Sequence, residues 1–479
     1  MSIRLRYTGI INFGSNLFSI ITGLIFSAIV ARNLSQTDIG LWYFIDTNIA
    51  IFVLLKNMIP FWLTRNYARG KDVASTGIIA NIILSIPFFL GYIIILPLFK
   101  NVWISPFHFG FASIFIIIQF ILSSLTALVR AKNPEKLAYS LVVGELVKLI
   151  GYPIITTYQL TGIIAITSIS HIARIFYLIR SLKLSKKIEL EHVRVWIGSS
   201  WVLIVGLIAS TILQNLHKYI LGLLSLESLG FYSIYNVITS KILIANSLAS
   251  GLYPKLLSGK GKSEDVEDVL SITAMFAIPM MLGGIILARD LVSILGSKYL
   301  HIDLANLILF IMFIEAFIRV FNIVFRNISE GSEKKDFGTF DQKTILKSSI
   351  FLNNIIPYLA LIVSAPLLFT LVPSSGLIAV VCIRLGSAII LCSLRYVLAS
   401  KAIKFEVPVK RIAKYIMASI LMVLILLFLP RGRGSIITVI EVMSGFIIYM
   451  ASLWILDKET RKLITSVIKE TRSLIKMDS

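Results

Sequence analysis

Charged side chains inside long apolar segments are the residues of this chain whose types and positions could do chemistry. They are the cations Lys56, Lys148, Arg174, Lys218, Lys241, Arg319 and Arg384, and the acids Asp46, Glu145, Glu315 and Glu441. Placing one charged side chain near the middle of a bilayer costs about 2.5–3.5 kcal/mol on insertion scales, so protein or water must compensate it. Seven cations against four acids leave a positive surplus, which favours an anionic ligand.

The depth of these cations separates them into two groups. Lys218 lies near the end of a predicted span, where its stem can carry the ammonium group to the interface, and Lys56 can do so in part. Four cations lie about ten residues from either end of a span, and the roughly 15 Å to the interface exceeds the length of their stems. These four, Lys148, Lys241, Arg319 and Arg384, must face protein or water.

Pairing with an acid is the alternative to a ligand-binding role. Glu145 and Lys148 are three residues apart and Glu315 and Arg319 are four apart, so each pair can form within one helix. These pairs can be structural or functional. In contrast, three cations have no acid one turn away in their own helix, and we expect them to line a water-filled cationic cavity: Arg174, Lys241 and Arg384.

A diphosphate needs about two or three cationic partners, which matches this surplus. We therefore predict a substrate site formed by Arg174, Lys241 and Arg384, with Lys148 and Lys56 in support. The acids Asp46, Glu145 and Glu315 are candidate sites for a coupling ion, H⁺ or Na⁺.

The sequence contains no recognisable catalytic arrangement. Its five histidines are scattered without metal-ligand spacing, and it has no glycine-rich phosphate-binding motif of the ATPase type. We predict that the protein is not an enzyme and uses no metal and no cofactor.

The composition predicts the elements that must position these charges. Hydrophobic residues make up 57% of the 479 residues and charged ones 15%, with a mean hydropathy of +0.88. The apolar runs are about 20 residues long, so they predict an all-α polytopic membrane protein. We expect about fourteen transmembrane helices, at 8–31, 40–63, 76–99, 108–129, 137–158, 162–182, 197–222, 229–251, 268–290, 303–327, 348–371, 375–397, 412–429 and 435–456.

The net charge of +21 is interpreted as a topology signal. Lys and Arg gather after the even-numbered spans, so the positive-inside rule places these connections and both termini in the cytoplasm. We expect a multi-pass protein of the cell (cytoplasmic) membrane whose contacts are membrane lipids, without a nucleic-acid partner. Cys382 and Cys392 lie within one predicted helix, so no disulfide is expected.

A short motif occurs twice. The segment 31–43 contains Leu-Ser-Gln-Thr-Asp-Ile-Gly-Leu-Trp-Tyr, and 224–232 repeats Leu-Ser, an acid, an aliphatic residue, Gly and an aromatic residue. In each copy the serine can cap a helix, and Gly40 or Gly230 permits close helix contact. Two membrane hairpins can look alike by chance, but the repeat favours a duplication.

The repeat predicts the domain organisation. Residues 1–182 and 197–397 form two pseudo-symmetric six-helix lobes, joined by a cytoplasmic linker at 183–196. Residues 398–456 form helices 13 and 14. Residues 457–479 have apolar side chains at helical spacing among basic ones, which predicts an amphipathic cytoplasmic tail.

With this repeat, two six-helix halves and a further helix pair, the chain resembles the multidrug/oligosaccharidyl-lipid/polysaccharide exporter superfamily, and within it the polysaccharide-type flippases. The resemblance implies a V-shaped pair of lobes that exposes a central cavity alternately to each side. It also implies a lipid-linked oligosaccharide as substrate, with its phosphate held by cavity cations. Arg174, Lys241 and Arg384 fit by residue type and depth.

Two other functions are considered. A multidrug or organic-cation antiporter of the same superfamily needs an acid-dominated cavity, against which the surplus of cations argues. A membrane glycosyltransferase or polymerase is disfavoured by the short outer loops.

Overall fold

The structure, a computed structural model, describes residues 2–68, 70–99, 106–182, 188–198, 200–249, 252–257, 261–301, 304–333, 346, 348–428, 435–457 and 460–461. Most of the predicted tail at 457–479 and residues 183–187 of the predicted linker lie outside these ranges.

Every regular element in the described ranges is a helix, as the long apolar runs predict. The helices of the first half are α1 (Ser2–Asn33), α2 (Gln36–Phe52), η1 (Leu54–Asn57), α3 (Met58–Ala68), α4 (Ala74–Ile95), η2 (Leu96–Phe99), α5 (Pro106–Ala112), α6 (Ile114–Lys132), α7 (Pro134–Ile150), α8 (Tyr152–Ile179), α9 (Leu190–Gly198) and α10 (Trp201–Leu224). Those of the second half are α11 (Leu226–Thr239), η3 (Ser240–Ala249), α12 (Leu252–Leu257), α13 (Ser263–Ile286), α14 (Ala288–Leu295), η4 (Ser297–Leu300), α15 (Ala305–Gly331), α17 (Ser349–Ala402), α18 (Val409–Phe428) and α19 (Ser435–Leu456).

These helices correspond to the fourteen predicted spans. Some spans are broken into two helices, and some helices contain two spans. Within the described ranges, nine helices are long and apolar enough to cross a membrane, and α2 with α3 makes a further span bent by 54°. The 54-residue α17 holds two spans, which meet where Gly376 has a left-handed backbone with φ of +54°. Similarly, α8 turns at Gln159, with φ of 47°, between the predicted fifth and sixth spans. The predicted fold class, an all-α polytopic membrane protein, is confirmed.

The contacts divide the chain into two compact units. The first comprises Met1–Val237 with Asp336–Ile383, and the second Ile238–Lys335 with Arg384–Ser479. These boundaries differ from the predicted lobes 1–182 and 197–397, since α10 and α11 pack within the first unit. The lobes therefore stay a prediction.

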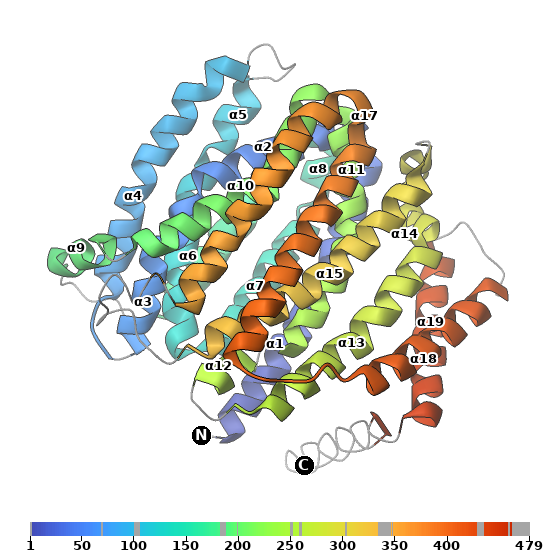
Figure 1. Ribbon diagram of the computed structural model, residues 1–479. Helices are drawn as coiled ribbons and strands as arrows, with labels where there is room; N and C mark the ends of the chain where they lie inside the picture. The colour runs from blue at the N-terminus through green and yellow to red at the C-terminus, as the bar shows by residue number, and fades with distance from the viewer. Residues whose placement is uncertain are drawn as a thin grey trace, which may run out of the picture. The chain divides into compact units, whose positions relative to one another are not determined.

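Within the first unit, α3, α4 and α6 lie side by side (Figure 1). Their interface buries apolar side chains, among them Met58, Leu63 and Leu128. Elsewhere α7 packs against both α1 and α8. This arrangement brings together the three helices that carry Thr22, Glu145 and Arg174.

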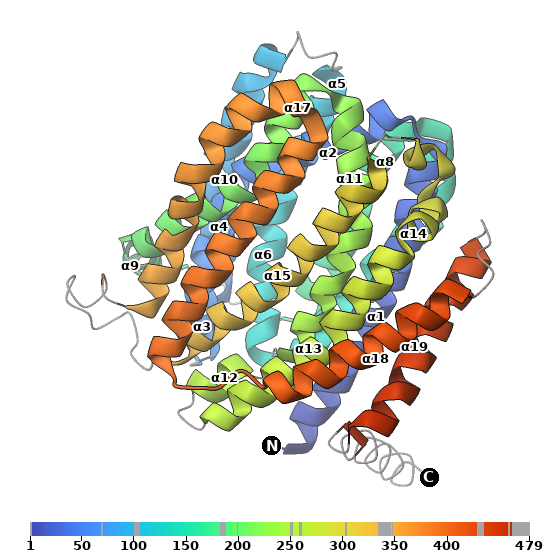
Figure 2. The ribbon, with the colours of Figure 1, turned by 45° about the vertical axis from the view of Figure 1, so that its right-hand side comes forward.

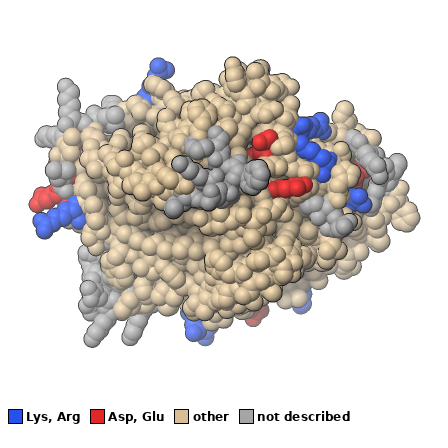
Figure 3. All heavy atoms as spheres, turned by 90° about the horizontal axis from the view of Figure 1, so that it is seen from above, with Lys and Arg blue, Asp and Glu red and all other residues tan. Residues whose placement is uncertain are grey.

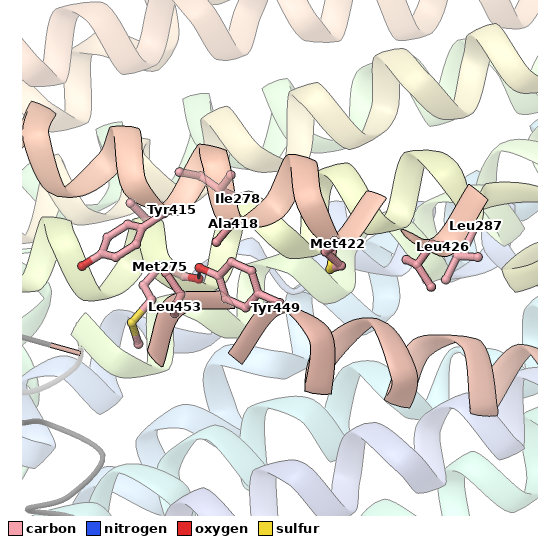
Figure 4. Packing of buried hydrophobic residues seen from close by; sticks show 10 residues of the cluster. Met275, Ile278, Leu287, Tyr415, Ala418, Met422, Leu426, Tyr449 and Leu453 are labelled. Atoms are coloured by element: carbon pink, nitrogen blue, oxygen red, sulfur yellow. Dashed lines mark hydrogen bonds between the residues drawn. The ribbon is translucent and has the colours of Figure 1, made fainter. Parts of the chain in front are cut away.

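Within the second unit, α13 is packed against α15 and α18, and α18 against α19 (Figure 2). Figure 4 shows the buried side chains that join α13, α18 and α19, such as Met275, Tyr415 and Tyr449. The Tyr449 hydroxyl donates to the Met275 carbonyl at 2.5 Å, and the Ser271 and Tyr415 hydroxyls lie 2.8 Å apart. The predicted helices 13 and 14 are therefore fixed to α13 by packing and by hydrogen bonds.

The surface is apolar where lipid is expected. In α4, Ile83, Leu90 and Ile94 are 52–74% exposed, although this helix is among the most apolar. The exposed apolar side chains of α4 suit hydrocarbon as solvent. Figure 3 looks from above onto the helix ends, where charged side chains form small groups among uncharged atoms.

The two copies of the repeated motif adopt the same local structure. Ser35 caps α2 by accepting a 3.0 Å hydrogen bond from the Asp38 amide, and Ser225 accepts one of 3.1 Å from the Ser228 amide. A side chain at Gly40 would strike the Leu226 carbonyl, and one at Gly230 would strike the Gln36 carbonyl. The predicted capping and close approach are both confirmed.

Candidate substrate-binding region

The second span breaks where it carries Lys56. The α-helix α2 ends at Phe52, the 3₁₀ turn η1 covers Leu54–Asn57, and α3 then continues at an angle of 54° to α2. A break at membrane depth frees backbone groups, which lipid cannot satisfy. Broken helices of this kind often form the substrate and ion sites of transporters.

Polar side chains from neighbouring helices satisfy the backbone at this break. The Lys56 carbonyl accepts hydrogen bonds from Ser123 Oγ at 2.8 Å and from Asn81 Nδ2 at 3.2 Å. Asn81 is fully buried and also donates to the Phe120 carbonyl at 2.8 Å. The break is thus built into the fold by α4 and α6, and Lys56 is held at a defined position.

The eighth span shows a related break around Lys241. The α-helix α11 ends at Thr239, and the next ten residues, Ser240–Ala249, form the 3₁₀ helix η3. Runs of 3₁₀ helix beyond three or four residues are uncommon and often mark a functional hinge. Lys241 is half-buried in this segment. Both candidate lysines therefore lie in 3₁₀ segments of the span that follows a copy of the repeated motif.

The Lys56 ammonium group begins a chain of hydrogen bonds. It donates to Gln119 Oε1 at 2.9 Å, and Gln119 Nε2 lies 3.4 Å from His171 Nε2. Since lysine only donates, the amide oxygen must face Lys56, and the amide NH₂ group then faces His171. His171 Nε2 must accept, so the ring is neutral and its Nδ1–H donates to the Thr167 carbonyl at 2.7 Å.

Glu145 is the centre of a second charged group in the first unit. Its Oε1 accepts a 2.9 Å bond from Lys148, which confirms the predicted pair, and its Oε2 lies 3.4 Å from the Thr22 hydroxyl. Arg174 interacts electrostatically with Glu145 from the neighbouring helix α8. The Arg174 stem packs on Gly144, and its Nε is buried without a hydrogen-bond partner among the described residues.

Glu315 holds two arginines in the second unit. Arg384 Nη2 lies 2.7 Å and Arg319 Nη1 3.7 Å from Glu315 Oε1. The predicted pair of Glu315 and Arg319 is confirmed. The stronger partner is Arg384, which comes from another helix, so the search for acids within one helix could not find it.

Asp46 differs from the other two candidate acids. Glu145 and Glu315 are buried, whereas Asp46 is exposed although it lies within the second span. Its electrostatic neighbours are Lys218 and Lys56. Of the three acids, Asp46 is therefore the one with an exposed side chain.

Several polar residues of the interior were missed in the sequence. Arg395 is 7% exposed and donates to Asn322 Oδ1 at 3.0 Å, while its Nε has no hydrogen-bond partner in the described part of the chain. Arg395 lies two residues before the end of the predicted span 375–397, where an arginine is expected to reach the interface. Asn81, Gln119 and His171 are uncharged polar residues, which a search for charges does not find. No group of three or more His, Cys, Asp or Glu side chains in the described ranges could hold a metal ion.

The comparisons with known proteins support the fold. No family model matches the sequence, and no curated protein matches it. Among solved structures, the lipid II flippase MurJ is similar over 95% of this chain and 100% of its own, with 16% identity and a TM-score of 0.70. An inward-facing multidrug resistance MATE transporter of the MOP superfamily covers 82% of this chain and 98% of its own, at 14% identity and a TM-score of 0.57. The eukaryotic MATE transporter AtDTX14 covers 86% and 96%, at 13% identity and a TM-score of 0.57.

The chain has the fold of these transporters. This fold agrees with the resemblance noted in the sequence, while the V-shaped pair of lobes stays a prediction. The likeness concerns the fold alone, because the identities lie between 13% and 16%.

Proposed function

We propose that the protein is a flippase that moves a polyprenyl-(di)phosphate-linked oligosaccharide from the cytoplasmic to the outer leaflet of the cell membrane. Lys56, Lys148, Arg174, Lys241 and Arg384 interact with the phosphate groups. In this proposal both termini are cytoplasmic, and the two lobes at 1–182 and 197–397 expose the site alternately.

The observation that carries the proposal is the pair of broken spans. Each contains a lysine in a 3₁₀ segment, Lys56 in η1 and Lys241 in η3. An ammonium group beside irregular backbone at membrane depth needs compensation by an anion, by protein or by water. Protein already contributes at Lys56, through Gln119 and Asp46. In the proposal a substrate phosphate adds to this compensation and leaves again when the conformation changes.

The charge balance of the spans favours an anion over an organic cation. The first unit carries Lys56, Lys148, Arg174 and Lys218 against Asp46 and Glu145. The second carries Lys241, Arg319, Arg384 and Arg395 against Glu315 and Glu441. Among these interior residues each unit therefore has twice as many cations as acids, and attraction of a cationic drug is weak in such a field.

Transport in this proposal breaks no covalent bond. The glycan crosses through water between the lobes, while the polyprenyl tail stays in lipid. The exposed Asp46 is the preferred site for a coupling H⁺ or Na⁺, because Glu145 and Glu315 already accept bonds from Lys148 and Arg384. Occupation of Asp46 by a cation would weaken its attraction for Lys56 and thereby free that lysine for phosphate.

Multidrug antiport is the second candidate, since two of the similar structures are MATE transporters. The two functions predict opposite effects when the lysine charges are removed. Removal of cations would weaken binding of a lipid diphosphate and would strengthen binding of an organic cation.

The test uses full-length protein in proteoliposomes with a fluorescent lipid-diphosphate oligosaccharide, read by a quencher that reaches only the outer leaflet. We expect Lys56→Gln and Lys241→Gln each to slow flipping at least about tenfold, the effect of losing about 1.4 kcal/mol of interaction. Lys401→Gln is the matched control, because Lys401 is exposed at the end of α17. Wild-type flipping by the double variant Lys56→Gln, Lys241→Gln, with normal abundance, would refute the proposal. Uptake of a fluorescent organic cation, increased in the same double variant, would support antiport instead.

A further inference from the structure

A pocket of about 480 Å³ lies between α7 and α8, outside the charged groups described above. Its polar lining comes from Lys136, Tyr177, Arg180 and Ser181. Its apolar lining comes from Val143, Ala173 and Phe176.

The two kinds of lining lie at different depths. Lys136 is in the first turn of α7, and Arg180 directly follows the last residue of α8, so both lie at the end of a span. Val143 and Ala173 are each seven residues further into their helix, which corresponds to a depth of about 10 Å. The pocket is therefore cationic at the membrane interface and apolar toward the hydrocarbon region.

The cationic end is not neutralised by protein. No carboxylate lines the pocket, and in the part of the chain that the structure describes neither Lys136 nor Arg180 forms an ion pair. Arg180 is exposed and Lys136 half-buried, so both remain accessible. Phe176, at the apolar end, is 63% exposed, which is a large apolar surface for one side chain.

We propose that this pocket binds the phosphate group of a membrane lipid. The Arg180 guanidinium group donates two parallel hydrogen bonds to the phosphate, and Lys136 adds a second positive charge. The Tyr177 hydroxyl can donate a further hydrogen bond, whereas the Ser181 hydroxyl donates to the Tyr177 carbonyl at 3.1 Å and would have to rotate to reach the phosphate. The hydrocarbon chain lies against Val143, Ala173 and Phe176, as in the basic pockets between membrane helices that bind anionic lipids.

The bound lipid would also neighbour the charged group around Glu145. Arg174 follows Ala173 directly, and Glu145 lies two residues after Val143. A lipid wedged between α7 and α8 would therefore affect the packing that brings Arg174 next to Glu145. The site does not depend on the proposed transport substrate, since an ordinary anionic phospholipid also carries an anionic phosphate, as a diester where polyprenyl phosphate has a monoester.

The experiment uses purified full-length protein in nanodiscs of phosphatidylcholine, with photoactivatable phosphatidylglycerol in one arm and photoactivatable polyprenyl monophosphate in the other. We expect crosslinks in peptides that contain Val143, Ala173 or Phe176 in at least one arm. The double variant Lys136→Gln, Arg180→Gln should reduce them at least about tenfold, whereas Lys71→Gln, Lys401→Gln removes two exposed charges elsewhere and should not.

A second variant tests the apolar end with the charges intact. Ala173→Trp fills the space beside Phe176 and should abolish the crosslinks, with thermal stability measured as a control for folding. Labelling by phosphatidylglycerol identifies a bilayer lipid as the occupant, and labelling by polyprenyl phosphate alone identifies the substrate's carrier lipid. Labelling unchanged in both variants, or located away from α7 and α8 in the wild type, would overturn the proposal.

Discussion

Gly40 and Gly230 pack reciprocally, each against the backbone carbonyl four residues before the other. A Cβ at Gly40 would strike the Leu226 carbonyl, a Cβ at Gly230 would strike the Gln36 carbonyl, and the Gly40 amide nitrogen lies 3.2 Å from the position of the Gly230 Cβ. A contact in which residue i meets j and j meets i is the signature of a two-fold relation. The two copies of the repeated motif thus pack directly against each other.

This contact predicts a large effect of adding one methyl group. Gly40→Ala or Gly230→Ala places a carbon against backbone, which cannot rotate away as a side chain can. We expect each variant to lower stability by roughly 1–3 kcal/mol, seen as a lower melting temperature in detergent. Gly386→Ala is the control, because open space surrounds that helical glycine, and it should be neutral or slightly stabilising. Equal melting temperatures for all three variants would contradict the close packing.

The bond between Lys56 and Gln119 predicts non-additive mutations. Gln119→Leu leaves the ammonium group without its acceptor and should cost roughly 1–3 kcal/mol of stability. Lys56→Met in the same chain removes the unsatisfied charge, so the double variant should be more stable than the sum of the single effects indicates. Melting temperatures of the four proteins in the cycle measure the coupling. Simple additivity would show that the two side chains do not interact.

The pair of Glu315 and Arg384 predicts a different result for single and double changes. Glu315→Gln leaves the half-buried Arg384 and Arg319 without their shared, buried carboxylate and should destabilise by about 3–5 kcal/mol. Glu315→Leu combined with Arg384→Met should recover much of this loss. Glu264→Gln, at an exposed position, controls for the loss of a carboxylate. Recovery of folding without recovery of flipping would indicate a role in transport beyond structure.

Asp457, just after α19, predicts a pH dependence. Burial alone would raise the pKa of this carboxyl, but hydrogen bonds from Thr460, at 2.6 Å and 3.1 Å, and from Lys414, at 3.0 Å, lower the pKa below its usual 3.8. Because the folded pKa is the lower one, this stabilisation is complete above pH 3.8 and is lost as the pH falls toward the folded value. Asp457→Asn should therefore lower the melting temperature at pH 7 and have a smaller effect near pH 3. A difference that is independent of pH would exclude the ionised carboxylate as its source.

How much of the structure can be predicted from the sequence depends on whether a feature is local in the chain or arises from contacts between different helices. The spans follow from hydropathy, and the pairs Glu145–Lys148 and Glu315–Arg319 follow from helical spacing, because both are local properties. The breaks at Leu54–Asn57 and Ser240–Ala249 were not predicted, since apolar residues continue through them and the bonds that hold the first break come from Asn81 and Ser123 on other helices. Likewise, the acid that pairs with Arg384 lies on another helix.

The 3₁₀ helix Ser240–Ala249 has a mechanical consequence. A residue rises about 2.0 Å in a 3₁₀ helix and 1.5 Å in an α-helix, with roughly 120° and 100° of rotation respectively. Conversion of these ten residues to α-helix would therefore shorten the eighth span by about 5 Å and turn one end against the other by about 200°. Such a segment can change the length of a span and, at the same time, the direction in which its side chains point. Every residue keeps a helical hydrogen bond in this conversion.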